Sequence, residues 1–212
     1  MIENKINFLD YETRLDAVMA LAWSIFKAQF INERNFIRTE APFQYHFADI
    51  IKQVGNLHCF TRKDIFLVDL ETQCKNIKGK TKYVDITCQF VDQINCAIEL
   101  KFKKESSPYD HGRIDIYVDI EALELVCNDT FNVGKFYAIT NSKPYVNPSK
   151  VGVGTVFPTH DGHVTEANKS LWANCEGRKH ITVNLKNSYT FNWEKINEWY
   201  FLELTVRQKN VN

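Results

Sequence analysis

The stretch from Tyr83 to Lys104, YVDITCQFVDQINCAIELKFKK, constrains the fold of this chain more than any other segment. Polar and apolar residues alternate in it on both sides of a short polar run. Because successive side chains of a β-strand point to opposite faces, this alternation predicts a hairpin of two strands. We expect a three-residue turn at Asp92-Gln93-Ile94. The pairs set by this turn are Val91 with Asn95, Thr87 with Glu99, and Asp85 with Lys101.

One face of the predicted hairpin is polar and the other is apolar. The polar face carries Asp85, Thr87, Gln89, Asn95, Ala97, Glu99 and Lys101. The apolar face carries Ile86, Cys88, Phe90, Cys96, Ile98, Leu100 and Phe102. A slip of one residue would mix the two sets and bury charge, so burial alone favours this assignment of faces. Asp85 and Glu99 are then diagonal neighbours, close enough to share one cation.

The composition indicates an ordinary globular chain with charge gathered locally. Its 212 residues are 44% hydrophobic and carry no net charge, which predicts one domain over 1–212. A neutral chain counts against nucleic-acid binding, for which a basic excess is typical. Positive charge is nevertheless concentrated around the hairpin, where seven lysines lie. The alternative explanation is that lysines are common in any exposed loop. They stand at Lys75, Lys78, Lys80, Lys82, Lys101, Lys103 and Lys104.

The six cysteines form no CxxC pair, so a zinc ribbon is not expected. The first ten residues show no basic leader followed by an apolar core, and the longest apolar run is too short to cross a bilayer. We therefore expect reduced thiols, no membrane partner and a cytoplasmic protein.

The rest of the pattern predicts a mixed α/β (α+β) fold. Helices are expected at 10–30, capped by Asp10, and from Thr39 to Gly55. A strand at 64–71 precedes the hairpin, with Gly79 in the connecting turn, and completes a three-strand antiparallel meander. A crossover helix at 114–127 then leads to a parallel strand at 135–140. In the last third we expect strands at 181–185 and 199–206 around a short helix at 193–197.

This order of elements, together with Asp85 and the triplet Glu99-Leu100-Lys101, resembles the PD-(D/E)xK superfamily of restriction-endonuclease-like nucleases. The resemblance covers about 36–140 and leaves 141–212 as a C-terminal elaboration. It matches Asp85 to the first acid of the motif, Glu99 to the second and Lys101 to the lysine. Glu40 takes the place of the glutamate in the preceding helix. Val84 stands where the motif has proline.

The resemblance implies a metal-dependent DNA endonuclease of restriction or defence type, with RNA as a further possible substrate. Asp85, Glu99 and the carbonyl of Leu100 offer the hard oxygen ligands that Mg²⁺ prefers, and Mn²⁺ can substitute. Lys101 would orient or deprotonate a water, and Glu40 would join the metal shell. Enzymes of this type commonly act as homodimers.

Other interpretations remain open. Glu99 or Asp85 could form a surface ion pair with Lys101. Glu40 could serve only to stabilise the helix, because a negative charge is favourable near a helix N-terminus. Gln44 could orient a ligand or face solvent, and Arg113 could touch a phosphate or be an exposed, ion-paired residue. His160 and His163 could bind zinc, although an exposed turn explains them better. A cysteine nucleophile has no marker here. A second functional hypothesis is a catalytically inactive module that binds a protein or nucleic-acid partner.

Overall fold

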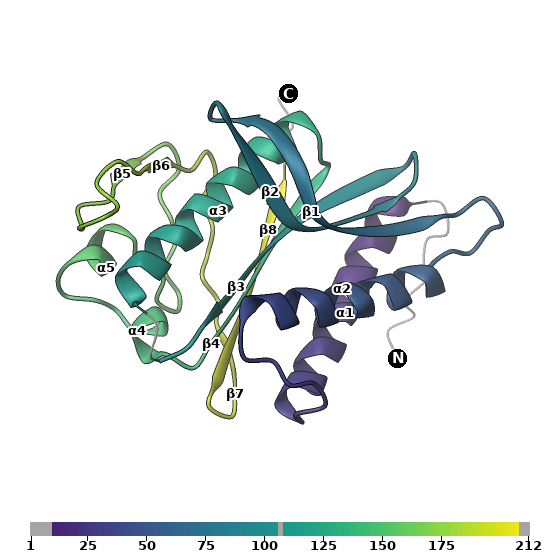
Figure 1. Ribbon diagram of the computed structural model, residues 1–212, viewed down its shortest axis with the longest axis horizontal. Helices are drawn as coiled ribbons and strands as arrows, with labels where there is room; N and C mark the ends of the chain where they lie inside the picture. The colour runs from purple at the N-terminus through teal and green to yellow at the C-terminus, as the bar shows by residue number, and fades with distance from the viewer. Residues whose placement is uncertain (1–9, 106–107, 208–212) are drawn as a thin grey trace.

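A computed structural model describes residues 10–105 and 108–207 of the chain, and Figure 1 shows its helices and strands. The helices are α1 Tyr11–Ile31, α2 Glu40–Leu57, α3 Tyr109–Asp129, α4 Lys143–Val146 and α5 Val153–Val156. The main sheet contains β1 Phe66–Ile77, β2 Lys80–Phe90, β3 Ile94–Lys103, β4 Val133–Thr140, β7 Glu194–Ile196 and β8 Trp199–Arg207. A small second sheet pairs β5 Ser170–Trp172 with β6 Thr182–Asn184.

The main sheet is mixed, with strand order β1-β2-β3-β4-β8-β7. Strands β1, β2 and β3 form an antiparallel meander, and α3 crosses over to β4, which runs parallel to β3. Strands β8 and β7 add antiparallel partners beyond β4. The predicted α/β class, meander, crossover helix and parallel strand are confirmed.

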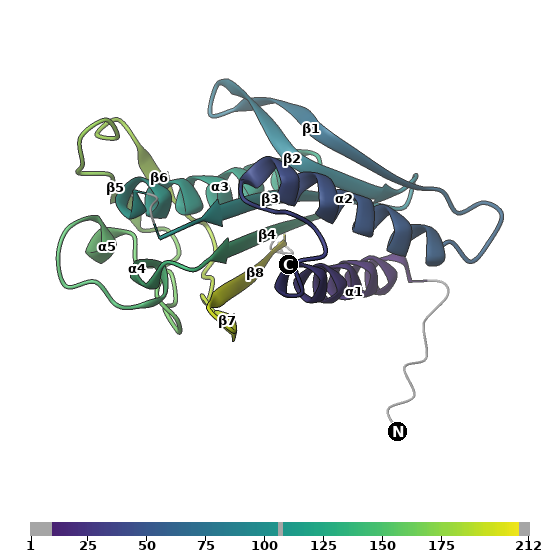
Figure 2. The same ribbon diagram turned by 60° about the horizontal axis from the view of Figure 1, so that its bottom comes forward.

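The two faces of the sheet pack against different helices. Helices α1 and α2 lie together against one face (Figures 1 and 2), and α3 lies on the other. All seven residues of the predicted apolar face of the hairpin belong to the α1–α2 core, where Ile86, Ile98 and Leu100 are fully buried. The predicted division of the hairpin into an apolar and a polar face is therefore confirmed.

The predicted register of this hairpin is wrong by two residues. The structure pairs Phe90 with Ile94 and Thr87 with Ala97, so the turn is Val91-Asp92-Gln93. Asp92 has a positive φ of 60° and is the third residue of a β-turn that the hydrogen bond from the N–H of Gln93 to the carbonyl of Phe90 closes, at 3.0 Å. Because the side-chain period of a strand is two, a shift of two leaves every side chain on its predicted face.

Several element boundaries differ from the prediction. Helix α2 does not end at Gly55 but continues to Leu57. The position needs a glycine because Phe66 of β1 packs against it; a Cβ there would lie 2.1 Å from the Phe66 ring. Helix α3 starts at Tyr109 rather than at 114. The predicted short helix at 193–197 is wrong, because Glu194–Ile196 is strand β7 and pairs with β8.

Candidate functional site

The candidate site lies where β2 separates from β3. Their ladder ends at the pair Ile86 and Ile98, so Asp85 is not paired with Lys101 as predicted. Instead, Oδ2 of Asp85 accepts a hydrogen bond from the main-chain N–H of Leu100 at 2.7 Å. The N–H and C=O of one strand residue point to the same side. The Leu100 carbonyl accepts from Nζ of Lys101 at 3.0 Å, so Asp85 and Lys101 meet at this opening.

Strand β2 bends at the same point. Val84 packs in the α3 core and Ile86 in the α1–α2 core, although alternate residues of a regular strand share a face. On β1, Glu71 lies opposite this bend and has a positive φ of 51°. The bend turns Lys82 toward α3, where its Nζ lies 3.2 Å from Oε1 of Glu99 and 2.8 Å from Oδ1 of Asp119.

Asp119 of α3 connects the two lysines. Its Oδ2 lies 2.7 Å from Nζ of Lys101, while its Oδ1 binds Lys82. Lys101 also lies 3.4 Å from Oε1 of Glu40, at the start of α2. We call the resulting group the carboxylate–lysine cluster; its members are Asp85, Glu99, Asp119, Glu40, Lys82 and Lys101.

Two main-chain contacts tie α2 to the cluster. Oε2 of Glu40 accepts from the N–H of Phe102 at 3.2 Å. One turn later, Nε2 of Gln44 donates to the carbonyl of Asp85 at 2.6 Å and to Oε1 of Glu71 at 2.7 Å. Gln44 thus binds the main chain of β2 and a side chain of β1, and its predicted solvent-facing alternative is wrong.

The cluster has more negative than positive groups. Its four carboxylates face two ammonium groups, which leaves a formal charge of −2 when all six are ionised. Glu99 and Asp119 are only 3% and 8% exposed, so solvent does little to screen them.

The pKa values follow from this imbalance. Burial, together with the charge of Asp119, raises the pKa of Glu99 well above its usual range. Burial also raises the pKa of Asp85 to about 6. Burial alone would lower the pKa of Lys101, but the charges of Asp119 and Glu40 outweigh it and raise that pKa. The cluster therefore keeps Lys101 positively charged, and it makes the ionisation of Asp85 and Glu99 less favourable.

The structure brings together all the residues predicted for the site, namely Asp85, Glu99, Lys101, Glu40 and the carbonyl of Leu100. The surface ion pair considered as an alternative is wrong for Glu99, which is buried and paired with Lys82. Arg113 is also buried, at 1% exposure, and donates to the carbonyl of Pro144 rather than facing solvent.

Two members of the cluster, Lys82 and Asp119, were not predicted from the sequence. Lys82 was counted among the lysines of a loop, and Asp119 was not singled out at all. Lys82 and Asp119 are 37 residues apart, so no local sequence pattern indicates that they are in contact. The one feature of the sequence that could have indicated Asp119 is that it is a charged residue at a helical position facing the sheet.

Within residues 10–105 and 108–207, no group of three or more His, Cys, Asp and Glu side chains is placed to hold a metal ion. The donor set predicted from the sequence is of another kind, with two carboxylates and one main-chain carbonyl. His160 and His163 lie on either side of the turn at Asp161-Gly162, as expected, with ring centroids 5.2 Å apart.

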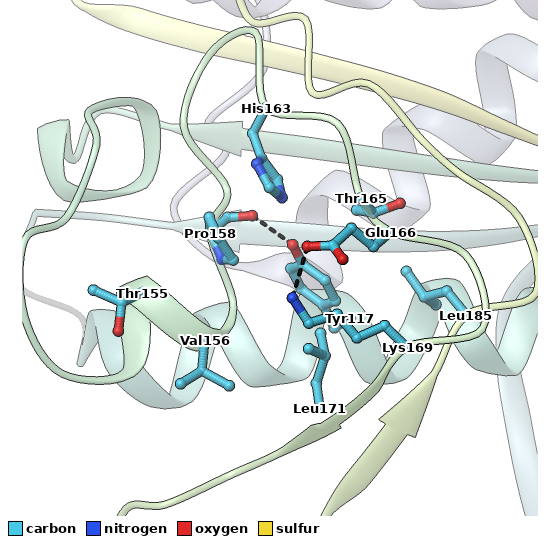
Figure 3. A pocket seen from close by; sticks show the side chains of 10 residues that line it. All are labelled: Tyr117, Thr155, Val156, Pro158, His163, Thr165, Glu166, Lys169, Leu171 and Leu185. Atoms are coloured by element: carbon cyan, nitrogen blue, oxygen red, sulfur yellow. Dashed lines mark hydrogen bonds and ion pairs between the residues drawn. The ribbon is translucent and has the colours of Figure 1, made fainter.

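A small pocket beside His163 offers little room for a ligand (Figure 3). Its volume is about 70 Å³. The hydroxyl of Tyr117 donates to the carbonyl of Pro158 at 2.6 Å, and Lys169 pairs with Glu166 at 2.6 Å. These polar groups are already partnered, so the cluster at the β2–β3 opening remains the stronger candidate.

Comparisons with known proteins do not identify the chain: no family model, no curated protein and no solved structure matches it. Among the described helices, none has the length and hydropathy of a membrane span.

The raised pKa of Asp85 predicts how stability depends on pH in the absence of metal. A carboxyl whose pKa rises from 3.8 to about 6 on folding stabilises the folded state below pH 3.8, and this contribution is lost as pH rises through about 6. Between pH 4 and pH 7, wild-type protein should lose on the order of 2 kcal/mol more stability than Asp85→Asn. Urea unfolding of both proteins in EDTA measures the difference, and equal pH profiles would contradict the raised pKa.

Proposed function

We propose that the chain is a metal-dependent phosphodiester hydrolase of the PD-(D/E)xK type that cleaves nucleic acid, foremost a DNA endonuclease of restriction or defence type. The observation that carries the proposal is the carboxylate–lysine cluster, which gathers four carboxyl groups around two ammonium groups at the opening between β2 and β3. The order of elements around it supports the same assignment, since the meander, crossover helix and parallel strand follow the pattern of that superfamily.

The residues present fit a divalent cation. Asp85, Glu99 and the Leu100 carbonyl are hard oxygen donors, which Mg²⁺ and Mn²⁺ prefer. An excess of two negative charges matches the charge of one such ion, and its presence would lower the raised pKa values of both acids. When bound, the ion would supply Lewis acidity and a more acidic water.

Each residue of the cluster would then have a separate role. Asp85 and Glu99 hold the ion, and Asp85 is itself oriented by the N–H of Leu100. Lys101 stays protonated because of Asp119, so it would place a positive charge beside the attacking water and the phosphoryl oxygens instead of acting as a base. Glu40 positions Lys101 and the main chain of Phe102.

One observation favours the second hypothesis, an inactive module that kept a similar core. Asp119 pairs with both lysines, so the cluster is also a connected ion network of a kind that can serve structure alone. A network with that role has no need of a cation and would not change when Mg²⁺ is added.

Supercoiled plasmid incubated with purified protein distinguishes the two hypotheses. We expect nicking with Mg²⁺ or Mn²⁺ and none in EDTA, because the acids alone cannot neutralise the charge that develops on the phosphate. Asp85→Ala should abolish nicking, whereas Asp69→Ala, at an exposed position of β1, should leave it unchanged. If plasmid, single-stranded DNA and RNA all stay intact with every metal tested, the inactive module is the better description.

A further inference from the structure

A groove of about 700 Å³ lies between the β1–β2 hairpin and α3. Figure 1 shows the hairpin reaching over α3. Lys80 and Tyr83 line the groove from the hairpin, and Val118 and Leu125 line it from α3. A volume of this size lies within the ~300–1,000 Å³ of sites that take small organic ligands.

The groove is lined by apolar side chains and by charged side chains. Val118, Leu125 and Ile181 provide the apolar surface. Its charged lining residues are Lys78, Lys80, Lys82 and Glu121. Lys78 is paired with Glu121, and Lys82 with Glu99 and Asp119 of the cluster, so Lys80 is the lysine of the groove that has no ion pair within the described residues. An apolar surface beside the exposed Lys80 is complementary to a nucleotide, which carries a flat base and an anionic phosphate.

Two contacts fix the groove relative to the cluster. Nζ of Lys78 pairs with Glu121 and donates to the carbonyl of Thr182 at 3.1 Å, which joins the hairpin to α3 and to β6. Lys82 lines the groove and also binds Glu99 and Asp119. The groove therefore begins at the carboxylate–lysine cluster.

We infer that this groove binds an unpaired nucleotide strand next to the phosphodiester that is cleaved. The substrate is then nucleic acid with an unpaired stretch at the point of cleavage: a single strand, a duplex with an unpaired end, or a supercoiled plasmid where its supercoiling opens the duplex locally. The inference rests on the proposed function. A base can reach the apolar floor only when it is unpaired, and a double helix is too large to enter the groove. Tyr83 is 52% exposed and offers an aromatic surface for stacking.

Binding without catalysis tests this inference. A fluorescent DNA strand of about 15 nucleotides and its duplex are titrated in EDTA and followed by anisotropy. The single strand should bind at least about tenfold more tightly than the duplex, because each stacked base adds affinity. Leu125→Glu and Lys80→Glu should each weaken single-strand binding about tenfold, since they place negative charge beside the phosphates.

The matched control is Lys52→Glu, which makes the same charge change at an exposed lysine of α2 and should alter binding less than about twofold. If Leu125→Glu fails to fold by circular dichroism, Lys80→Glu decides, since Lys80 is exposed. Duplex binding as tight as single-strand binding, or groove variants that match Lys52→Glu, would overturn the inference.

The outcomes also separate this inference from the proposed function. Mg²⁺-dependent nicking of plasmid with no effect of the groove variants on single-strand binding would remove the groove and leave the hydrolase. Groove-dependent single-strand binding without cleavage of any substrate would remove the hydrolase and leave a binding site for unpaired strands.

Discussion

Lys101→Ala should lower the rate of Mg²⁺-dependent DNA cleavage at least about 100-fold. The ammonium group lies 3.0 Å from the Leu100 carbonyl, beside the proposed metal ligands, and Asp119 holds it in the charged form. Removing it takes away the positive charge that β3 places closest to the proposed metal ligands, where charge develops in the transition state. Single-turnover cleavage of a labelled substrate at saturating protein measures the chemical step directly.

The matched control for Lys101→Ala is Lys103→Ala, two residues along the same strand. Lys103 lies on the same face of β3 but is paired in register with Thr140, beyond the cluster. Its replacement should change the rate less than about threefold, by weakening non-specific attraction to phosphate alone. Equal losses in the two variants would mean that Lys101 acts only through net charge, which would remove it from the proposed mechanism.

Lys101→Ala must also remain folded for its rate to be informative. Lys101 is one of two cations that neutralise Asp119, so its loss has a structural cost as well. Lys101→Arg keeps the charge but carries it on a longer, planar group. It should restore the melting temperature without restoring the full rate, because the geometry at the Leu100 carbonyl is no longer met.

The sequence was informative where local periodicity decides the structure. The faces of the hairpin followed from alternation alone, and they placed Glu99 and Lys101 on the face toward α3 and Leu100 in the opposite core. The register did not follow, because either of two three-residue turns satisfies the same alternation. In the observed turn, Asp92 takes the positive φ, a conformation that aspartate tolerates better than most residues.

The missing members of the site depend on a bend and a tertiary contact. Lys82 would face away from Lys101 on a regular strand; it reaches Glu99 because β2 changes direction between Val84 and Ile86. Asp119 comes from a helix whose position over the sheet no local pattern specifies. Strand β7 was mistaken for a helix for a similar reason, since three residues carry too little periodicity to outweigh pairing with β8.

Arg14→Ala should lower the free energy of unfolding by about 3 to 5 kcal/mol. Nη2 of Arg14 lies 2.6 Å from Oδ2 of Asp64, and the two side chains are 1% and 0% exposed. The guanidinium group stacks over the rings of Tyr11, Phe60 and Phe90 at 4.5 to 4.7 Å. Its loss would leave the Asp64 carboxylate buried without a countercharge and open a cavity between α1 and β2. Urea unfolding followed by circular dichroism measures the change.

The control for Arg14→Ala is Arg207→Ala, which removes a more exposed pair with Asp16 and should cost less than about 1 kcal/mol. Arg14→Met separates the two causes of the expected loss, because methionine fills most of the space of the arginine stem but carries no charge. If Met recovers little of the stability, the uncompensated Asp64 carboxylate dominates. A full recovery would mean that Arg14 matters for packing, and that the buried ion pair adds nothing to the frame that holds β1 and β2 at the site.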